Sequence, residues 1–246
     1  MAKCGYLAQN TTAFALTAAS SAAPIASIAF ATPTVTVNLT SAVTGYNAAT
    51  FTPAVGHRAL IQTATTFSNN GDFVLATAPS TTQVTFANSA GLAQAAAGGT
   101  ISFSVPQTVL AVTAPATFGY DLKKVELSFS GVSTTVGPYL VELVSYTALT
   151  GGTSITSPAS QIQQVYGPAM SAVGFTVTGP YTAEPTGATV LDSWLVTPNQ
   201  TTLIYDWPLG VSYDGPVSGS IALRLTPHGT ATASATVRAA MLVERC

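Results

Sequence analysis

Hydrophobic and polar residues alternate with a period of two along most of this chain. In the segment that starts at Val125, the apolar residues Val125, Leu127 and Phe129 alternate with polar ones. The same period runs through residues 221–225, where Arg224 stands between apolar positions. A period of two puts alternate side chains on opposite faces of a β-strand. The pattern therefore predicts half-buried strands, with Arg224 facing outward.

The C-terminal region carries the longest alternation. Small or apolar residues occupy every second position from Ala231 to Val243, and mostly polar residues fill the positions between them. We expect one long strand there, with Ala231, Ala233, Ala235 and Val237 on its inward face. Small side chains let a facing sheet or a neighbouring subunit approach closely.

Glycine and proline mark turns at strand-length intervals, and no window of a dozen residues keeps a helical stripe. The turns stand at Gly151-Gly152, Gly167-Pro168, Gly179-Pro180, Asp214-Gly215-Pro216 and Pro227-His228-Gly229. Many short strands between such turns are typical of two packed sheets. The sequence therefore predicts an all-β fold, with an antiparallel β-sandwich or jelly-roll-like main domain.

A second, smaller β-unit is expected between residues 31 and 101. Alternation opens it over 34–40 and continues through 59–66, and a further strand is expected at 83–87. The Ala-Gly tract at 95–99 has the composition of a flexible exit. The expected domains are 1–30, an N-terminal arm with the first strand of the main domain; 31–101, an inserted small β-domain; and 102–246, the main β-sandwich domain.

A hairpin is expected inside the small domain. The residues Ser68-Asn69-Asn70-Gly71 separate two short apolar runs, 65–67 and 73–76. Asn-Gly pairs favour the primed turns that match the twist of two-residue hairpins. The sequence therefore predicts a tight primed turn at Asn70-Gly71.

Charged residues are scarce in this chain. They make up 7% of its 246 residues and leave a net charge of −2, whereas about a quarter of the residues are charged in an ordinary globular domain. The chain lacks the basic patch and high isoelectric point that nucleic-acid binding requires, so nucleic acid is not expected as a partner. A surface with so little charge is suited to contact with other subunits, and we expect a homo-oligomer, either a trimer or a dimer.

Neither a membrane segment nor a disulfide framework is expected. The uncharged stretch Thr11–Phe30 is as long as a bilayer crossing, but it is rich in Thr and Ser and poor in large aliphatic residues. It also lacks the apolar region of a secretory signal. Cys4 and Cys246 are interpreted as two free thiols, and pairing between the termini or across subunits remains the alternative.

Candidate catalytic chemistry is sparse, and we expect no enzyme, no cofactor and no metal. His57 and His228 each stand near a glycine in a turn and are interpreted as solvent-facing. Lys123 and Lys124 alternate with acidic neighbours and are interpreted as a solvated strand end. The carboxylates of the C-terminal third are expected at surface or turn positions, with a glycan depolymerase using Glu184 or Asp192 as the alternative; they are Glu184, Asp192, Asp206 and Asp214.

Aromatic residues gather in the C-terminal third. Tyr205 and Trp207 flank Asp206, and Trp194 and Tyr213 are near in sequence. A Trp or Tyr face can stack on a sugar ring, so Tyr205, Trp207 and Tyr213 are candidate glycan contacts. Alternation with Ile204 and Asp206 favours a core position for at least one of these rings.

Several segments resemble a family of small structural proteins of tailed bacteriophages. They are the N-terminal MAKCGYLAQNTTAFALTAA, residues 109–129, AEPTGATVLDSWLVTP, LIYDWPLG, SIALRLT and a last strand ending near Glu244. Glu184-Pro185-Thr186 and Trp207-Pro208-Leu209-Gly210 look like that family's fixed turns. The resemblance covers residues 1 to about 20 and about 105 to 246 and includes no catalytic signature. Typical members lack the segment from 31 to 101.

The resemblance implies a virion structural protein on the phage particle, made in the host bacterial cytoplasm. The expected role is a capsid decoration or cement protein that binds the major capsid protein and stabilises the head. The alternative is a tail or fibre component that binds a host surface glycan. The small domain either projects as a knob or widens the contact with the shell. The expected interface residues are Met1, Ala2, Lys3, Cys4, Tyr6 and Leu7 of the N-terminal arm, with Ala231, Ala233, Ala235 and Val237 of the last strand.

Overall fold

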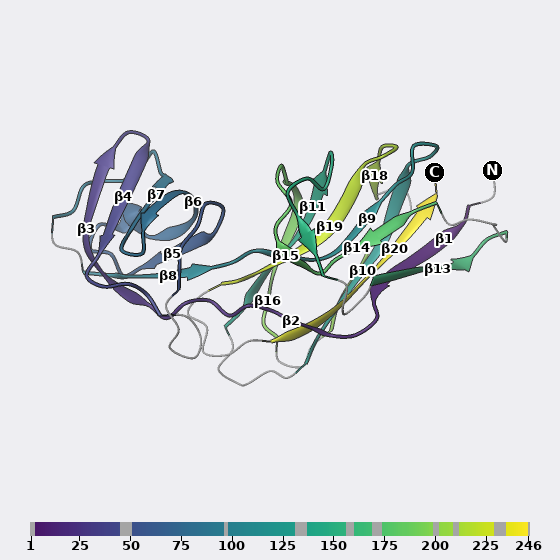
Figure 1. The fold of residues 1–246 in the computed structure, drawn as a ribbon, viewed down its shortest axis with the longest axis horizontal. Coiled ribbons are helices and arrows are strands. Elements are labelled where there is room, and N and C mark those ends of the chain that lie inside the picture. Colours follow the sequence, from purple (N-terminus) through teal and green to yellow (C-terminus); the bar gives the residue numbers. More distant parts are fainter. Residues whose placement is uncertain are drawn as a thin grey trace.

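The computed structural model describes residues 3–44, 51–95, 98–130, 137–155, 160–168, 174–198, 202–208, 212–228 and 235–245. Over these ranges the fold is all-β, with antiparallel sheets and one short 3₁₀ helix, η2 (Phe67–Asn69). No helix in the described part of the chain is long and apolar enough to span a bilayer. Figure 1 shows two lobes, a barrel at one end and a larger lobe that we call the two-sheet unit.

The barrel closes through six of the described strands. Its order is β3-β4-β7-β6-β5-β8, formed by β3 (Ala23–Ala31), β4 (Thr34–Leu39), β5 (Arg58–Gln62), β6 (Gly71–Ser80), β7 (Gln83–Ala87) and β8 (Thr100–Ser104). Apolar residues at alternate positions fill the interior, among them Val37, Ile61 and Phe103. Phe86 stacks on Phe73 with 4.3 Å between the ring centroids. Closure leaves this small lobe with its own apolar core.

The barrel is longer at both ends than the predicted small domain. Its strands run from Ala23 to Ser104, whereas the sequence placed the boundaries at 31 and 101. Residues before 31 belong to β3, which pairs with both β4 and β8 rather than with a strand of the main domain. A bulge between Ile25 and Ser27 breaks the period of two in β3. That break conceals the strand from a reading based on alternation.

The β5–β6 connection differs from the predicted tight turn. The two strands do pair, with Ile61 opposite Gly71, but residues 63–70 lie between them. Asn70 has φ −77° and ψ 142°, an extended conformation rather than a primed turn. Its side chain accepts a hydrogen bond from Ala64 N at 2.8 Å and donates one to Ala64 O at 3.2 Å. The Asn70 amide therefore closes a wider loop.

The larger sheet of the two-sheet unit contains both ends of the described chain. Among the described strands its order is β13-β1-β20-β10-β17, with β18 beside β10 and β2 beside β20. The strands are β1 (Gly5–Asn10), β2 (Phe14–Ala15), β10 (Tyr120–Ser130), β13 (Ser160–Tyr166), β17 (Thr202–Asp206), β18 (Tyr213–Gly215) and β20 (Thr236–Arg245). β1 and β20 are neighbours in the interior of the sheet. Figure 1 shows both termini together, at the end of the molecule away from the barrel.

The smaller sheet has the order β14-β9-β19-β11-β16 in the described part of the chain. Its strands are β9 (Gln107–Thr113), β11 (Tyr139–Tyr146), β14 (Thr176–Thr178), β16 (Thr189–Val196) and β19 (Ser220–Pro227). One hydrophobic cluster draws Tyr6 and Met241 from the larger sheet and Val141 and Leu223 from the smaller. The two sheets therefore share a core. A short pair, β12 (Thr153–Ser154) and β15 (Tyr181–Ala183), stands apart from both sheets.

Two chain segments connect the lobes and lie side by side. Ser20, on the way into the barrel, donates from its backbone N to Phe103 O at 2.7 Å and accepts from Phe103 N through Oγ at 2.8 Å. Thr17 N donates to the Gln107 side-chain oxygen at 2.5 Å. Paired connections restrict how the barrel can turn relative to the two sheets.

Candidate functional site: the junction between the lobes

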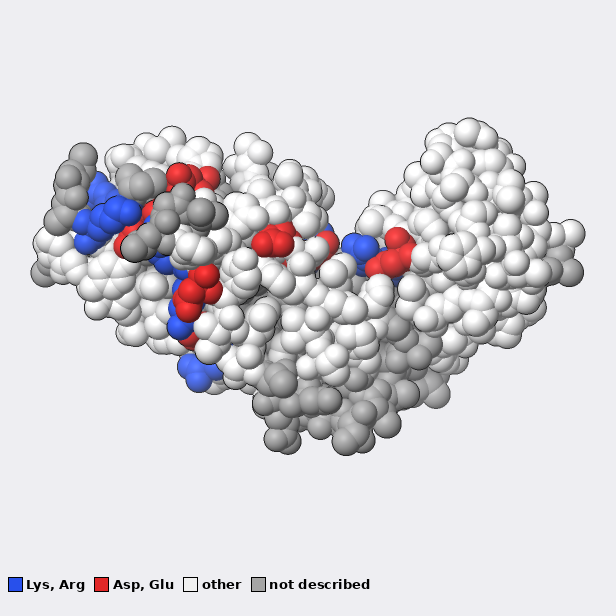
Figure 2. Space-filling model, turned by 180° about the vertical axis from the view of Figure 1, so that it is seen from behind, with Lys and Arg blue, Asp and Glu red and all other residues white. Residues whose placement is uncertain are grey.

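The barrel carries only two charged residues, and both lie at its junction with the two-sheet unit. Between residues 23 and 104, Arg58 and Asp72 are the only charged side chains in the sequence. Arg58, at the start of β5, contacts both carboxylate oxygens of Asp72 on β6 through Nε, each at 3.1 Å. Figure 2 shows a blue and red group in the notch between the lobes, beside an otherwise white barrel.

Side chains of the two-sheet unit extend this pair into a chain of alternating charge, which we call the junction network. Glu142 on β11 lies directly opposite Arg224 on β19, and Arg224 Nε donates to Glu142 Oε2 at 2.9 Å. The other Glu142 oxygen is 3.7 Å from a terminal nitrogen of Arg58. On the far side, His228 Nδ1 is 3.2 Å from Asp72 Oδ2. The junction network thus runs His228, Asp72, Arg58, Glu142, Arg224.

Burial makes the junction network sensitive to the loss of a member. The Glu142 side chain is only 5% exposed. Burial alone would lower the pKa of Arg224, but the hydrogen bond and the charge of Glu142 outweigh it and raise that pKa. A buried ion is stable only when its partners are present. His228, which the sequence places in a solvent-facing turn, thus contacts the other lobe through its side chain.

Glu184 is a half-buried carboxyl beside the junction network. It follows β15, and its oxygens accept hydrogen bonds from the backbone N and from Oγ1 of Thr108, the latter at 2.8 Å. Burial raises the pKa of Glu184, although the bonds from Thr108 act in the opposite direction. The sequence predicts a surface or turn position for this carboxylate, and in the structure it is half-buried in the loop between β15 and β16. Asp206 and Asp214 are exposed.

A cleft of about 640 Å³ opens between the lobes at this point. The barrel contributes His57, Arg58 and Val74, and the two-sheet unit contributes Glu184 and Arg224. Burial lowers the pKa of His57, whose Nδ1 accepts a hydrogen bond from Ala54 N at 3.2 Å. Within the described residues, no group of three or more His, Cys, Asp or Glu side chains could hold a metal ion. Geometrically, the contacts around the cleft tie one lobe to the other.

The half-buried Glu184 gives the fold an expected pH dependence. Its pKa is raised in the folded state, so the folded protein binds this proton more tightly than the unfolded chain does. The resulting stabilisation is present below the ordinary carboxyl pKa and is lost as pH rises through the raised value. As pH rises above the ordinary carboxyl pKa, wild type should lose stability relative to Glu184→Gln. Urea denaturation of both proteins at a series of rising pH values measures the difference.

The other acidic groups make the E184Q comparison informative. The pKa values of Asp121 and Glu244 are lowered, because bonds from their neighbours outweigh burial. These two groups make stability rise with pH, which is opposite to the effect of Glu184. They do so equally in wild type and E184Q, so their effect cancels when the two free energies of unfolding are subtracted. A difference between wild type and E184Q that does not change with pH would contradict a raised pKa at Glu184.

The structure brings the candidate glycan-binding rings together. Tyr205 and Trp207 lie 4.8 Å apart between centroids, Trp194 and Tyr205 5.3 Å, and Trp207 and Tyr213 5.5 Å. The Tyr205–Trp207 and Trp207–Tyr213 pairs meet edge to face. Trp194, Trp207 and Tyr213 also pack against the shared core of the two sheets. These rings therefore contact one another and the core across the side where β16 meets β17.

The N-terminal interface residues lie in a sheet rather than on an arm. Tyr6 is fully buried because β1 is an interior strand, and Cys4, which directly precedes β1, is nearly so. Their side chains pack inside their own chain and are not available to a neighbour. Leu7 is half-buried, and Lys3 is exposed. Met1 and Ala2 lie outside the described residues.

The expected interface residues of the C-terminal strand also pack inside their own chain, where the structure describes them. Ala235 and Val237 are fully buried against the facing sheet. Small residues at these positions thus serve the packing of sheet on sheet. Ala231, Ala233 and Cys246 lie outside the described residues.

A second charge cluster surrounds the two chain ends. Lys3 Nζ donates to Glu244 Oε2 at 3.0 Å, and the Tyr166 hydroxyl donates to Glu244 Oε1 at 2.5 Å. Asp121 and Lys123 form an ion pair beside them. Burial first, and then Glu244, raise the pKa of Tyr166. The expected solvated strand end at Lys123 is therefore a partly buried ion-pair cluster.

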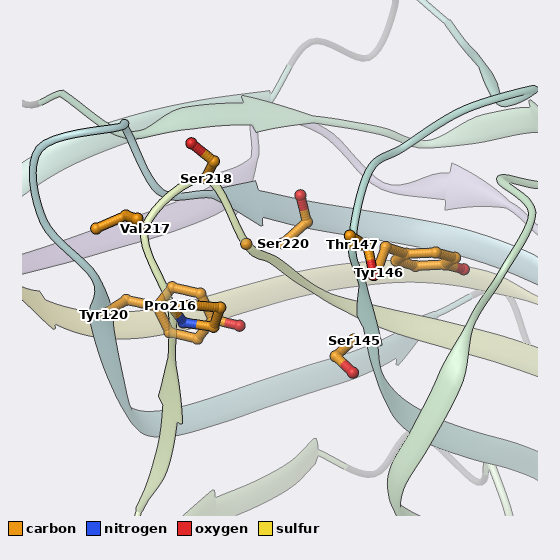
Figure 3. Close-up of a pocket in the computed structure, with 9 residues that line it drawn as sticks. Tyr120, Ser145, Tyr146, Thr147, Pro216, Val217, Ser218 and Ser220 are labelled. Atoms are coloured by element: carbon orange, nitrogen blue, oxygen red, sulfur yellow. The ribbon is translucent and has the colours of Figure 1, made fainter.

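A smaller pocket of about 290 Å³ lies at the end of the two-sheet unit, lined by the Pro216–Gly219 loop and β11. Most of its side chains carry hydroxyls. Figure 3 shows that these hydroxyls diverge, with Ser145 and Ser218 pointing to opposite sides and Tyr146 pointing away. The Tyr146 hydroxyl is 3.2 Å from Thr108 Oγ1, and Ser220 Oγ is 2.8 Å from Thr113 Oγ1. These contacts serve the fold rather than a common ligand position.

The chain matches no protein family, no curated protein and no solved structure among those compared. A functional assignment therefore has to come from its own residues and surfaces.

Proposed function

We propose that this protein is a bacteriophage virion structural protein, a capsid decoration subunit that binds the major capsid protein. The observation that carries the proposal is the barrel surface. Arg58 and Asp72, the only charges between residues 23 and 104, are used at the junction, so the rest of the barrel surface is uncharged. Covering such a surface desolvates no ion, whereas each unpaired ion costs several kcal/mol to bury. The barrel is the lobe best suited to lie against other subunits.

Exposed apolar side chains support the same role. On the barrel, Phe67 is 88% exposed, and Val55 and Leu92 are also largely exposed. The bond from Asn69 Nδ2 to Leu92 O, at 2.9 Å, holds the Leu92 loop beside η2. Exposed apolar patches on a soluble chain mark interaction surfaces. We assign the region around Phe67 and Leu92 to the contact with the shell.

The topology of the two-sheet unit supports a jelly-roll-like sandwich. Eight of its described strands after the barrel are, in chain order, β9, β10, β11, β13, β14, β16, β17 and β19; the last strand, β20, and the short β12, β15 and β18 lie outside this set. The first pairs with the eighth, the second with the seventh and the third with the sixth, and β13 contacts β14. Nested pairing of this kind is what a folded antiparallel ribbon produces. Jelly rolls are common in viral capsid and lectin domains, and the phage resemblance agrees with the former.

Cryo-electron microscopy of phage particles with the gene intact and deleted tests the proposal. We expect the deletion to remove density at regular positions on the head. Loss of density from the tail or fibres instead would overturn the decoration role and favour glycan binding.

Adding purified protein back to the deleted particles tests the barrel contact. Phe67→Lys should reduce occupancy at least about tenfold, because it puts an unpaired charge into the contact. Val217→Lys, at an exposed apolar position of the two-sheet unit, is the matched control and should bind as wild type does. Equal binding by both variants would exclude this face of the barrel.

A further inference from the structure

The edge strand β17 has the features of a sheet edge that is covered in the assembled protein. It ends the larger sheet among the described strands, so one side of its backbone has no strand paired to it there. Ile204 is 55% exposed, and Tyr205 is also exposed. Its sequence, Thr-Leu-Ile-Tyr-Asp, has no Lys and no Pro, its one charged residue is the last, Asp206, and its pairing with β10 has no bulge. Proteins that keep an edge free of partners protect it by such devices.

Two other described edges show the protection that β17 lacks. β13, at the opposite end of the same sheet, pairs with β1 through a bulge between Gln164 and Tyr166. β16 pairs with β11 through a bulge beside Asp192. Pairing of β17 with a further strand would satisfy its outer hydrogen-bonding groups.

We propose that β17 pairs with β17 of a second copy of this chain, antiparallel about a two-fold axis at Ile204. This register places Ile204 against the same residue of the other copy. It places Tyr205 opposite Leu203 and Asp206 opposite Thr202. Apolar residues therefore meet apolar residues, and the charged residue meets a neutral one. The contact is isologous, so it closes at two copies and leaves no growing edge.

The charges beside β17 permit this pairing. Lys124 lies next to Asp206 within one chain, and Glu126 lies next to Ile204. Across the axis, the two Glu126 residues stand three strand spacings apart, about 14 Å. That distance exceeds the screening length of about 8 Å at physiological ionic strength. Repulsion between the two copies is thus weak, while Ile204 and Tyr205 become less exposed. Self-association through β17 is a property of the purified chain and needs no capsid.

Sedimentation velocity of the full-length protein over micromolar concentrations tests the pairing. Wild type is expected to be a dimer. Ile204→Lys should weaken the dimer about tenfold, because it replaces an apolar pair at the axis by two like charges directly opposite each other. Val217→Lys is the control and should remain dimeric. A monomeric wild type, or an I204K protein that still associates as wild type does, would overturn the proposal.

Charge exchange provides a second readout specific to the two-fold register. Ile204→Glu alone should weaken the dimer in the same way. Mixing it with Ile204→Lys should restore a one-to-one dimer, since opposite charges then meet at the axis. Circular dichroism of both variants checks that they fold. Failure of the mixture to dimerise would contradict pairing through Ile204 and leave β17 to a strand from a different protein.

Discussion

Replacing Glu142 with alanine is expected to lower the free energy of unfolding by about 3–5 kcal/mol, the usual cost of removing one partner from a buried ion pair. Glu142 is the carboxylate that both Arg58 and Arg224 contact. Its loss leaves Arg224 without its hydrogen-bonded partner in a buried position. Urea denaturation followed by tryptophan fluorescence measures the effect, because Trp194 and Trp207 both lie in the two-sheet unit.

The matched control is Glu126→Ala. Glu126 also pairs with a cation, Lys124, but on the outer face of the larger sheet with 38% of its side chain exposed. Exposed ion pairs contribute about 0–1 kcal/mol, so this change should lower the free energy of unfolding by no more than about 1 kcal/mol. Equal losses in the two variants would show that the Glu142 pair is not buried in solution.

Replacing Phe86 with alanine is expected to destabilise the barrel by about 3–5 kcal/mol, through lost burial and the cavity left behind. Phe86 is almost fully buried and stacks on Phe73. Because the barrel has its own core, we expect the effect to concentrate in β3 to β8. Hydrogen exchange followed by mass spectrometry should show lost protection over residues 23–104 and little change in β10, β19 and β20.

Phe67→Ala provides the comparison within the same lobe. Its ring is the most exposed of the large apolar side chains described in the barrel, so truncation should cost less than about 0.5 kcal/mol, as is usual at the surface. Protection lost equally in both lobes of Phe86→Ala would mean that the barrel and the two sheets unfold as one unit.

Strand positions could be predicted from the sequence because a buried face imposes a period of two. β7 was expected at 83–87 and occupies Gln83–Ala87. Alternation in β10 from Val125 onward matches its burial. In β19 the prediction of a half-buried strand with Arg224 facing outward was wrong, because this strand lies inside the smaller sheet and nearly all of its residues are buried. The rule fails in β3, where a bulge shifts the period. It also fails at the Asn70 turn, because the Asn70 side chain bonds to the backbone of Ala64 instead of shaping a two-residue turn.

The junction network could not be predicted because its members are far apart in the chain. Glu142 and Arg224 are 82 residues apart, and Asp72 and His228 are 156 apart. Within its own strand, Arg224 looks like an outward residue of a half-buried sheet. Alternation gives the face of a side chain but not the strand beside it. The scarcity of charge in residues 23–104 was the available signal, since the few charges retained there are used at the junction.

The position of the N-terminus was missed for a similar reason. The sequence of a short N-terminal segment does not indicate whether its strand lies between two others, so an arm was the simpler interpretation. In the structure, β1 is hydrogen-bonded on one side to β13 and on the other to β20. Pairing order depends on the whole sheet rather than on the strand.

The adjacency of β1 and β20 also decides how the protein responds to mechanical load. The two strands are antiparallel neighbours that end together, with Gly5 opposite Glu244 and Gln9 opposite Ala240. A force that pulls the termini apart therefore breaks the hydrogen bonds between β1 and β20 one residue pair at a time, starting from the end of the pair. A force applied between the barrel and the termini instead runs along β1, where the hydrogen bonds to both neighbours resist together in shear. The same sheet is weak in the first direction and strong in the second.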